Sequence, residues 1–313
     1  MTVGVALIGV GMWGGRMAAA ADRAGLRVVT CFARDERRRA EFAAQAGCEA
    51  ATSLEAAIER HDVEGVLLVT PNDTHAEQAI AAAERGRHVF VEKPIADTVD
   101  AAERMRDACA RAGVALSVGH AFRRLGAARR VRELIDAGVL GRVVLAEATL
   151  SLPGSFPAHA WRAHRARNPG GPLMQLGIHH VDTLGSWLGP IERSTGRFTR
   201  VATDADIDDV GVVTGSYVSP KTLALRLQGT DTVLEYRTDF SVWPDAQRLD
   251  QATTLAVGGE AVSFQERDML AEELAEFGRC VREGAVPETG AEEGIRALRA
   301  VLDALETWAP ASL

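Results

Sequence analysis

Gly9-Val10-Gly11-Met12-Trp13-Gly14 is the stretch that decides how the first part of this sequence folds. It follows an apolar run at 3–8 and opens a helical pattern at 14–24. In G-x-G-x-x-G the first glycine makes a tight turn, the second lets the backbone approach a pyrophosphate, and the third lets helix and strand pack closely. The glycine pattern alone could be an ordinary turn. Between a strand and a helix it predicts a dinucleotide site at a helix N-terminus.

The same alternation of strand and helix continues to about residue 120. Apolar runs predict strands at 3–8, 26–32, 63–69, 88–91 and 114–118, with a short one near 50–51. Helical patterns occupy 14–24, 35–46, 53–60, 74–85 and 98–112. Alternating strands and helices imply right-handed βαβ units, and so an α/β Rossmann domain with a doubly wound parallel sheet. We place this domain at 1–121.

A different pattern follows a predicted helix at 126–137. Longer runs rich in Val, Thr, Leu and Tyr predict strands at 142–152, 208–218, 221–228, 231–240 and 252–258. Helical patterns lie at 172–188, 268–283 and 291–308. We therefore expect an α+β domain with a mostly antiparallel open sheet over 122–313. Apolar residues at 210–257 predict either a sheet face that another surface covers or side chains that only fill the core between sheet and helices; they are Val212, Tyr217, Leu223, Leu225, Leu227 and Leu234.

Composition narrows the class of protein. The 313 residues are 47% apolar and 25% charged, as in a globular protein of about two domains. A net charge of −8 argues against nucleic acid or an anionic membrane as partner. The four cysteines (Cys31, Cys48, Cys109 and Cys280) are far apart, which favours reduced thiols over a disulfide framework or zinc site. Without a basic N-terminal region or a long apolar span, the chain is predicted to be cytoplasmic.

The end of the second predicted strand indicates which nucleotide binds. Many NAD sites place Asp or Glu there, about 20 residues after the glycines, to bind the ribose hydroxyls. This chain has Ala33-Arg34 followed by Asp35, with Arg37 and Arg38 one turn further. A small residue and a guanidinium suit a 2′-phosphate, so NADP is predicted. NAD remains an alternative, because the arginines could simply be solvated and Asp35 could bind the ribose.

Two more motifs end predicted strands. Thr70-Pro71-Asn72-Asp73-Thr74-His75 follows one strand and Glu92-Lys93-Pro94 follows the next. Ligands of open α/β sheets bind beyond these carboxyl ends. Of 35 basic residues only Lys93 and Lys221 are lysine. An ammonium at Lys93 can stabilise a developing alkoxide, and a forked guanidinium would be a poor substitute for this compact donor. The alternative is that Lys93 is an incidental surface lysine.

A third motif lies at the predicted helix 172–188. Gly170-Gly171-Pro172-Leu173-Met174-Gln175-Leu176-Gly177-Ile178-His179-His180-Val181-Asp182 places Gln175, His179 and Asp182 on one face of an α-helix. His180 points elsewhere and is expected to be structural. Asp182 is expected either to orient His179 or to cap local structure.

Together these motifs resemble the Gfo/Idh/MocA family, named for glucose–fructose oxidoreductase, inositol dehydrogenase and a rhizopine-catabolism protein. The resemblance covers essentially the whole chain. Besides the motifs above, it rests on Val118-Gly119-His120, Arg123, Trp161-Arg162, Phe277, Gly284, Pro287 and Gly290. It implies an NAD(P)-dependent oxidoreductase that moves hydride to or from a carbinol or carbonyl carbon of a sugar, cyclitol or related polyol. It also implies pairing into homodimers or homotetramers through the second-domain sheet, and no metal.

The resemblance assigns His179 as the group that exchanges the substrate hydroxyl proton, beside Lys93. Expected cofactor-binding residues are Gly9, Gly11, Met12, Trp13, Gly14, Ala33, Arg34, Arg38, Thr70, Pro71, Asn72, His75, Glu92, Lys93 and Pro94. Expected substrate-binding residues are Lys93, Arg123, Trp161, Arg162, Gln175 and His179. Many relatives carry aspartate where this chain has Gln175. A glutamine cannot titrate, but its amide can hydrogen-bond substrate hydroxyls.

Two other function classes stay open from the sequence. One is a nicotinamide-dependent lyase or glycoside hydrolase, in which transient oxidation acidifies a neighbouring C–H bond. The other is a non-enzymatic dinucleotide sensor, against which Lys93 and His179 argue, since a sensor needs neither.

Overall fold

The computed structural model describes residues 2–151, 160–199, 210–212, 222–243 and 245–306. The chain divides into two compact units. The first consists of Met1–His120 together with Leu270–Leu298, and the second of Ala121–Met269 together with Arg299–Leu313. Residues 270–298, expected with the second domain, thus belong to the first unit. The domain division at residue 121 stays a prediction.

The first unit is built on a six-stranded parallel sheet in the order β3-β2-β1-β4-β5-β6. Its strands are β1 (Val3–Ile8), β2 (Leu26–Phe32), β3 (Glu49–Ala50), β4 (Gly65–Leu68), β5 (His88–Glu92) and β6 (Leu116–Gly119). Every residue of β1 and β4 is buried, as expected for strands covered on both faces. The strand order reverses direction between β1 and β4, which confirms the doubly wound Rossmann sheet predicted from the sequence.

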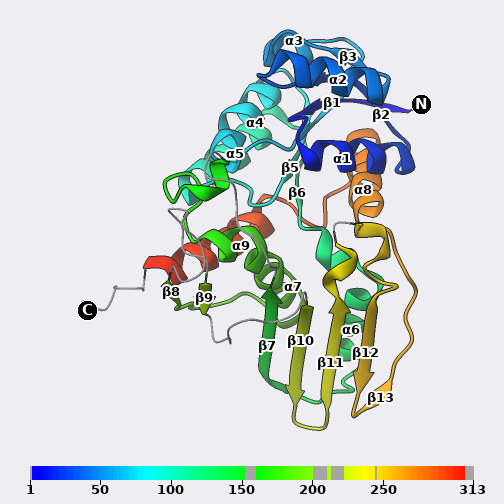
Figure 1. Cartoon of the computed structure of the whole chain (residues 1–313), viewed down its shortest axis with the longest axis vertical. Coiled ribbons are helices and arrows are strands. Elements are labelled where there is room, and N and C mark those ends of the chain that lie inside the picture. The colour runs from blue at the N-terminus through cyan, green and yellow to red at the C-terminus, as the bar shows by residue number, and fades with distance from the viewer. Residues whose placement is uncertain (1, 152–159, 200–209, 213–221, 244, 307–313) are drawn as a thin grey trace. The chain divides into compact units, whose positions relative to one another are not determined.

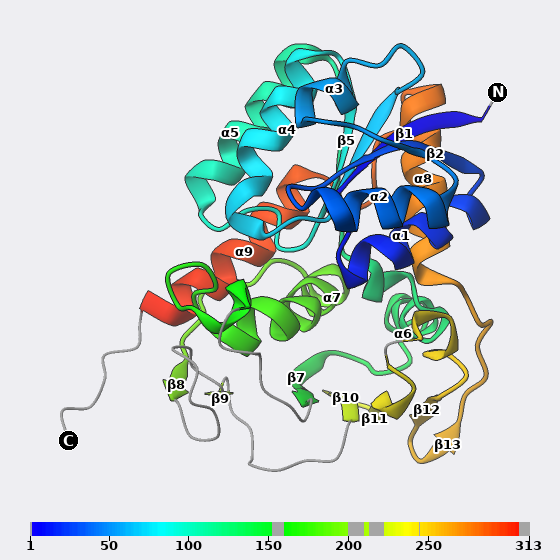
Figure 2. The same ribbon diagram turned by 45° about the horizontal axis from the view of Figure 1, so that its top comes forward.

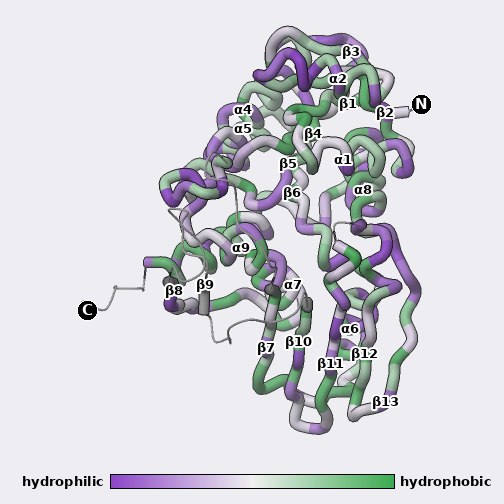
Figure 3. Tube along the Cα trace, viewed as in Figure 1, coloured by the Kyte–Doolittle hydropathy of each residue, from purple (hydrophilic) through white to green (hydrophobic). Residues whose placement is uncertain are grey.

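Helices cover both faces of this sheet (Figure 2). They are α1 (Met12–Arg23), α2 (Glu36–Ala46), α3 (Leu54–Ile58), α4 (His75–Glu84) and α5 (Val99–Ala112), with a 3₁₀ turn η1 at Asn72–Thr74. The Ser53 and Thr98 hydroxyls cap α3 and α5 by accepting from the N–H groups of Ala56 and Ala101. Figure 3 shows the contrast between hydrophobic β4 and hydrophilic α2.

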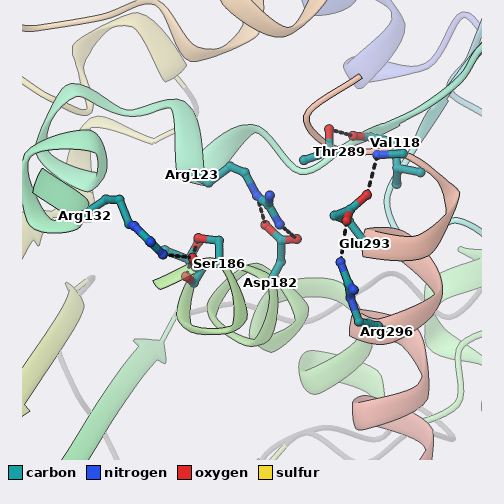
Figure 4. Close-up of polar contacts among 10 residues, drawn as sticks. Val118, Arg123, Arg132, Asp182, Ser186, Thr289, Glu293 and Arg296 are labelled. Carbon is teal, nitrogen blue, oxygen red and sulfur yellow. Dashed lines mark hydrogen bonds and ion pairs between the residues drawn. The ribbon is translucent and has the colours of Figure 1, made fainter. Parts of the chain in front are cut away.

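A segment from the C-terminal part of the chain completes the first unit. Phe277, on α8 (Met269–Glu283), packs edge-on against Phe90 and fills the space beside Gly65. Thr289 continues the sheet past β6: its carbonyl oxygen accepts from the Val118 N–H, and its hydroxyl donates to the Val118 carbonyl oxygen at 2.7 Å (Figure 4). The helix α9 (Ala291–Glu306) follows.

The second unit contains a five-stranded antiparallel sheet in the order β13-β12-β11-β10-β7 (Figure 1). The strands are β7 (Val143–Ser151), β10 (Thr222–Gly229), β11 (Val233–Asp239), β12 (Thr253–Val257) and β13 (Glu260–Ala261). The helices are α6 (Gly126–Asp136) and α7 (Ile178–Leu188). A separate pair joins β8 (Arg197–Thr199) to β9 (Val210–Val212). The described part of the strand predicted at 208–218 therefore lies outside the main sheet, and its remainder falls outside the described residues.

The two faces of the antiparallel sheet differ from the expectation of an apolar open face. Four leucines that were expected to form it are buried inside the unit: Leu223, Leu225, Leu227 and Leu234. The side chains between them are charged. Arg226 lies 3.8 Å from Glu147 and 3.9 Å from Glu235 across neighbouring strands. For these leucines the expectation was wrong, because alternation along a strand puts them on the core face. The side chains of Val212 and Tyr217 lie outside the described residues.

Among the described residues, no helix is long and apolar enough to cross a membrane. Nor does that part of the chain contain a cluster of three or more His, Cys, Asp or Glu side chains able to hold a metal ion.

Candidate active site

The glycine-rich turn forms an open cradle after β1. Gly9 has a φ of 106°, and a Cβ there would lie 2.6 Å from the Val69 carbonyl oxygen. A Cβ on Gly14 would collide with the Gly9 carbonyl oxygen, so this glycine allows the close packing of α1. At Gly11, by contrast, a Cβ would meet nothing within 4 Å. The turn is closed on the protein side and open on the other, as the fingerprint predicts for a pyrophosphate.

The N-terminus of α1 faces this opening without a side-chain cap. Gly11 is the N-cap residue and has no side chain to accept from the first N–H groups. Met12 begins the helix and is 72% exposed, while the Arg16 guanidinium stacks on the Trp13 ring at 5.0 Å. Uncapped N–H groups at a helix N-terminus favour an anion, so the residues present fit the phosphates of a dinucleotide.

The end of β2 carries the candidate nucleotide-selecting residues. Asp35 accepts from the Arg38 N–H at 3.0 Å, and its carboxylate thereby caps α2. Arg37 pairs with Glu41 at 2.7 Å. Arg34 is exposed and makes no hydrogen bond or ion pair within the described residues. The carboxylate that could have bound a ribose is engaged in helix capping, which leaves the Arg34 guanidinium as the group available beside Ala33.

Asn72 offers a buried amide that the described residues leave unsatisfied. It is 2% exposed, and neither its Oδ1 nor its Nδ2 has a hydrogen-bond partner. A buried amide without partners is costly, so a ligand group at this position would complete its hydrogen bonding. Asn72 follows β4, next to β1 in the sheet, and this orphaned amide is a second feature that fits a bound nucleotide.

His75 joins the loops after β4 and β5. Its Nε2 lies 2.9 Å from the Thr70 carbonyl oxygen, and its Nδ1 lies 3.1 Å from that of Pro94 and 3.3 Å from that of Ile95. Burial lowers the pKa of His75 below its usual range against the opposing effect of these carbonyl groups. His75 therefore ties together the two motifs predicted to meet at this edge. Both ring nitrogens face carbonyl groups of the protein.

The second motif of this edge places Lys93 at the end of β5. Glu92 is buried, Lys93 is half-buried, and the Lys93–Pro94 peptide bond is cis. A half-buried ammonium beyond the carboxyl end of a parallel strand can hydrogen-bond a reacting oxygen.

Within the second unit, His179 lies in an aromatic setting. The His179 ring stacks on Phe122 with the ring centroids 4.0 Å apart and an angle of 11° between the planes. Phe240 and Trp243 pack around Phe122 at 6.3 and 6.4 Å. The sequence analysis did not single out Phe122; its only signal is its place two residues after Val118-Gly119-His120. The stacked ring fixes the plane of the imidazole.

The Asp182 carboxylate is engaged by Arg123. Arg123 Nε donates to Asp182 Oδ2 at 2.9 Å, and Nη2 donates to Oδ1, a bidentate pair drawn in Figure 4. Both side chains are buried. His180, predicted to be structural, is buried, and burial lowers its pKa to about 4.

Gln175 lies at an irregularity in the predicted helix. Residues Leu173–Gly177 form a π-helical turn before α7 begins at Ile178, so the helix predicted over 172–188 is not a regular α-helix at Gln175. The common face of Gln175, His179 and Asp182 stays a prediction. Gln175 bonds Asn168 and Arg162, while Arg162 lies over Trp161 with 4.5 Å between guanidinium carbon and ring centroid. Asn168 was missed by the sequence analysis, since only its three-dimensional contacts distinguish it from a loop asparagine.

Comparison with known proteins agrees with this geometry. A model of the oxidoreductase family with an NAD-binding Rossmann fold matches residues 3–120, and a model of the GFO/IDH/MocA C-terminal domain matches residues 128–242. The fold and the nucleotide cradle thus define an NAD(P)-dependent oxidoreductase. The chain belongs to the Gfo/Idh/MocA family.

Individual relatives extend over most of the chain. It is 30% identical over 303 residues to D-xylose 1-dehydrogenase (NADP(+)) 2 of Haloferax volcanii, covering 90% of each protein. It is 29% identical over 261 residues to the 2,7-anhydro-N-acetylneuraminate hydratase of Mediterraneibacter gnavus, covering 82% of this chain and 67% of that protein. Among solved structures, a candidate NADPH-dependent oxidoreductase from Desulfitobacterium hafniense superposes with a TM-score of 0.91 at 34% identity, over 98% of this chain and 95% of the other.

Proposed function

We propose that this protein is an NADP(H)-dependent oxidoreductase that interconverts a carbinol and a carbonyl group on a sugar, cyclitol or related polyol. The observation that carries the proposal is the open cradle at Gly11 together with the unsatisfied buried amide of Asn72. The similarity to D-xylose 1-dehydrogenase along 90% of both chains supports a sugar as the substrate.

In this proposal the first unit binds the nucleotide. Gly9, Gly11 and Gly14 shape the turn, the first N–H groups of α1 bind the pyrophosphate, and Asn72 hydrogen-bonds the ligand. The remaining assignments to the cofactor are Met12, Trp13, Ala33, Arg34, Arg38, Thr70, Pro71, His75, Glu92, Lys93 and Pro94. Among them His75 acts through the loops it joins, since both of its ring nitrogens face carbonyl oxygens of the protein.

NADP is the preferred nucleotide in this proposal. Ala33 leaves room at the end of β2, Arg34 presents an unengaged guanidinium, and the Asp35 carboxylate is engaged in capping α2. A guanidinium binds a 2′-phosphate by bidentate charge-assisted hydrogen bonds, which the ribose hydroxyl of NAD cannot form.

The nicotinamide ring supplies or removes a hydride. The protein's own residues handle the proton and the charge on oxygen. Lys93 donates a hydrogen bond to the reacting oxygen, and His179 accepts the hydroxyl proton during oxidation and returns it during reduction. Trp161, Arg162, Gln175 and Arg123 belong to the substrate region, with Arg123 acting through its ion pair with Asp182 on α7.

A second function is favoured by one relative. The chain is 29% identical to a 2,7-anhydro-N-acetylneuraminate hydratase. If this chain belongs to that class, a nicotinamide nucleotide would stay bound and be regenerated in each cycle, so that elimination or hydration proceeds without net redox change.

We also propose that the protein is cytoplasmic and assembles as a homodimer or homotetramer through the second-unit sheet. The edge strand β7 supports this assembly, since Val144 is 60% and Leu145 48% exposed on it. Light scattering at micromolar concentration tests it, and a monomer mass would refute it.

A substrate panel tests the function. Aldoses, polyols and keto-sugars are each mixed with NADP⁺, NAD⁺ or their reduced forms, and absorbance at the nicotinamide band is followed. We expect turnover with at least one sugar and faster turnover with the NADP pair. Product formation without net change in nicotinamide absorbance would instead identify the second function.

A further inference from the structure

Three hydrogen bonds join Arg162, Gln175 and Asn168 into a closed ring, which we call the Arg162 circuit. Arg162 Nε donates to Gln175 Oε1 at 3.2 Å, and Gln175 Nε2 donates to Asn168 Oδ1 at 2.9 Å. Asn168 Nδ2 donates to the backbone carbonyl oxygen of Arg162 at 2.9 Å. Around the ring, the Gln175 and Asn168 amides each accept one hydrogen bond through oxygen and donate one through nitrogen. Reversing the Gln175 amide would set donor against donor at Arg162, so the circuit fixes its orientation.

Burial makes this circuit a rigid support. Asn168 is 0% and Gln175 6% exposed, so breaking either bond would leave a buried amide group unsatisfied. The circuit holds the half-buried Arg162 at its Nε and at its backbone, and the guanidinium carbon lies 4.5 Å from the Trp161 ring centroid. A flexible side chain is thereby restricted to one place on an aromatic face.

The circuit also defines what residue 175 can do. A carboxylate at this position could accept from Arg162 but could not donate to Asn168. A glutamine does both, and it neither takes up nor releases a proton at ordinary pH. The π-helical turn at Leu173–Gly177 carries Gln175 in this circuit. Gln175 is therefore built to hold a neighbour in place.

We propose that Gln175 and Asn168 are positioning residues for Arg162, and that the Arg162 guanidinium on the Trp161 face is a specificity-determining contact for the oxygens of the substrate. The proposal rests on the sugar oxidoreduction proposed above. A guanidinium presents a planar fork of donors that suits neighbouring oxygens of a sugar. Gln175 takes no part in proton transfer.

A double-mutant cycle on substrate kinetics tests this. Gln175→Ala, Arg162→Ala and the double variant are assayed at saturating NADPH or NADP⁺ with the sugar that the panel identifies. Each single change should raise KM about tenfold, the scale of one neutral hydrogen bond or slightly more, with kcat within about threefold. The double variant should be no worse than Arg162→Ala alone, because Gln175 acts only through Arg162. The pH profile of kcat should stay unchanged in Gln175→Ala.

Two further variants and a matched control keep the test decisive. Asn168→Ala should raise KM as Gln175→Ala does. If the fully buried position 168 does not tolerate truncation, Arg162→Lys provides the second test. This variant keeps the charge but loses the planar fork, so it should raise KM as Arg162→Ala does. Gln247→Ala, which breaks an exposed bond to Asp268, is the matched control and should leave KM unchanged. Urea unfolding of the four proteins of the double-mutant cycle measures the coupling between Gln175 and Arg162 without substrate. The changes in the free energy of unfolding should be non-additive.

Additive effects on KM, a normal KM in Arg162→Lys, or a shifted pH profile in Gln175→Ala would overturn the inference. Additive unfolding energies would do so even if no sugar were turned over. Absence of turnover with every sugar and both nucleotides, with coupling intact in the unfolding cycle, would count against the proposed function and not against the circuit.

Discussion

The two candidate regions of this molecule are built in opposite ways. In the first unit the positions expected to face the nucleotide are open: a Cβ at Gly11 would meet none of the described residues within 4 Å, and none of them hydrogen-bonds the Asn72 amide. In the second unit two sets of polar side chains are already bonded to one another, the Arg123–Asp182 pair and the Arg162 circuit. The first region is a backbone cradle that a ligand completes. The second is a preorganised wall of side chains that is ready before any ligand arrives.

The largest effect should come from removing the groups that handle the proton. We expect His179→Ala and Lys93→Met each to lower kcat by about 10²–10⁴-fold while NADPH affinity stays nearly normal, because positioned acid–base groups act on the reacting oxygen. Lys93→Arg should be nearly as poor, since a fork replaces a compact donor. Steady-state kinetics and fluorescence titration with NADPH measure both.

The exposed His61 provides the matched truncation, and His61→Ala should behave as wild type. Near-normal turnover in His179→Ala would show that the base lies elsewhere.

The open cradle can be closed with a single methyl group. Gly11→Ala should fold normally, because its φ is −72° and the new Cβ meets nothing within 4 Å. NADPH affinity should nevertheless fall about 100-fold, since the methyl group occupies the space of the phosphate and costs about one hydrogen bond to a charged group. Gly15→Ala is the control: it also meets no neighbour, lies inside α1, and should bind NADPH normally. Equal affinity in both variants would mean that the phosphates lie elsewhere.

We expect the free energy of unfolding to fall in acid because of a buried histidine in the second unit. Burial lowers the pKa of His180 to about 4 from 6.5, so below pH 6.5 the unfolded chain takes up a proton that the folded chain does not. The contribution of neutral His180 to the free energy of unfolding is therefore fully present above pH 6.5 and is lost as the pH falls toward 4. Between pH 7 and pH 5 this one group should cost about 2 kcal/mol, at 1.36 kcal/mol per pKa unit.

Urea unfolding of wild type and His180→Gln at the two pH values isolates that contribution. The variant should be less stable at pH 7 but should lose about 2 kcal/mol less on acidification. The same pH dependence in both proteins would contradict the buried neutral state. His75, whose pKa burial also lowers, is present in both and cancels in the difference.

The same contrast explains what the sequence could predict. Glycine positions, the strand–helix alternation and the loops at strand ends are local features, so the parallel sheet, the cradle and the place of Lys93 follow from them. The π-helical turn at Leu173–Gly177 leaves no mark in the apolar pattern, so the sequence predicted a regular α-helix where the structure has an irregular one. The contact of Phe122 with His179 joins segments that only the tertiary fold brings together, and the bond between Asn168 and Gln175 depends on the irregular turns between them.

The smallest effect, and the one that most sharpens the comparison, concerns Arg34 at the rim of the open region. We expect Arg34→Ala to weaken NADPH binding about tenfold and to leave NADH binding unchanged, because one exposed charge-assisted bond to the 2′-phosphate is lost. Raising the salt concentration should reduce the difference between wild type and variant, since exposed charges are screened. Arg37→Ala, in the first turn of α2 and paired with Glu41, is the matched control and should change neither affinity. An equal loss of affinity for both nucleotides in Arg34→Ala, or a wild-type preference for NADH, would contradict this role. Either result would mean that the Asp35 carboxylate gives up its hydrogen bond to the Arg38 N–H and binds the ribose.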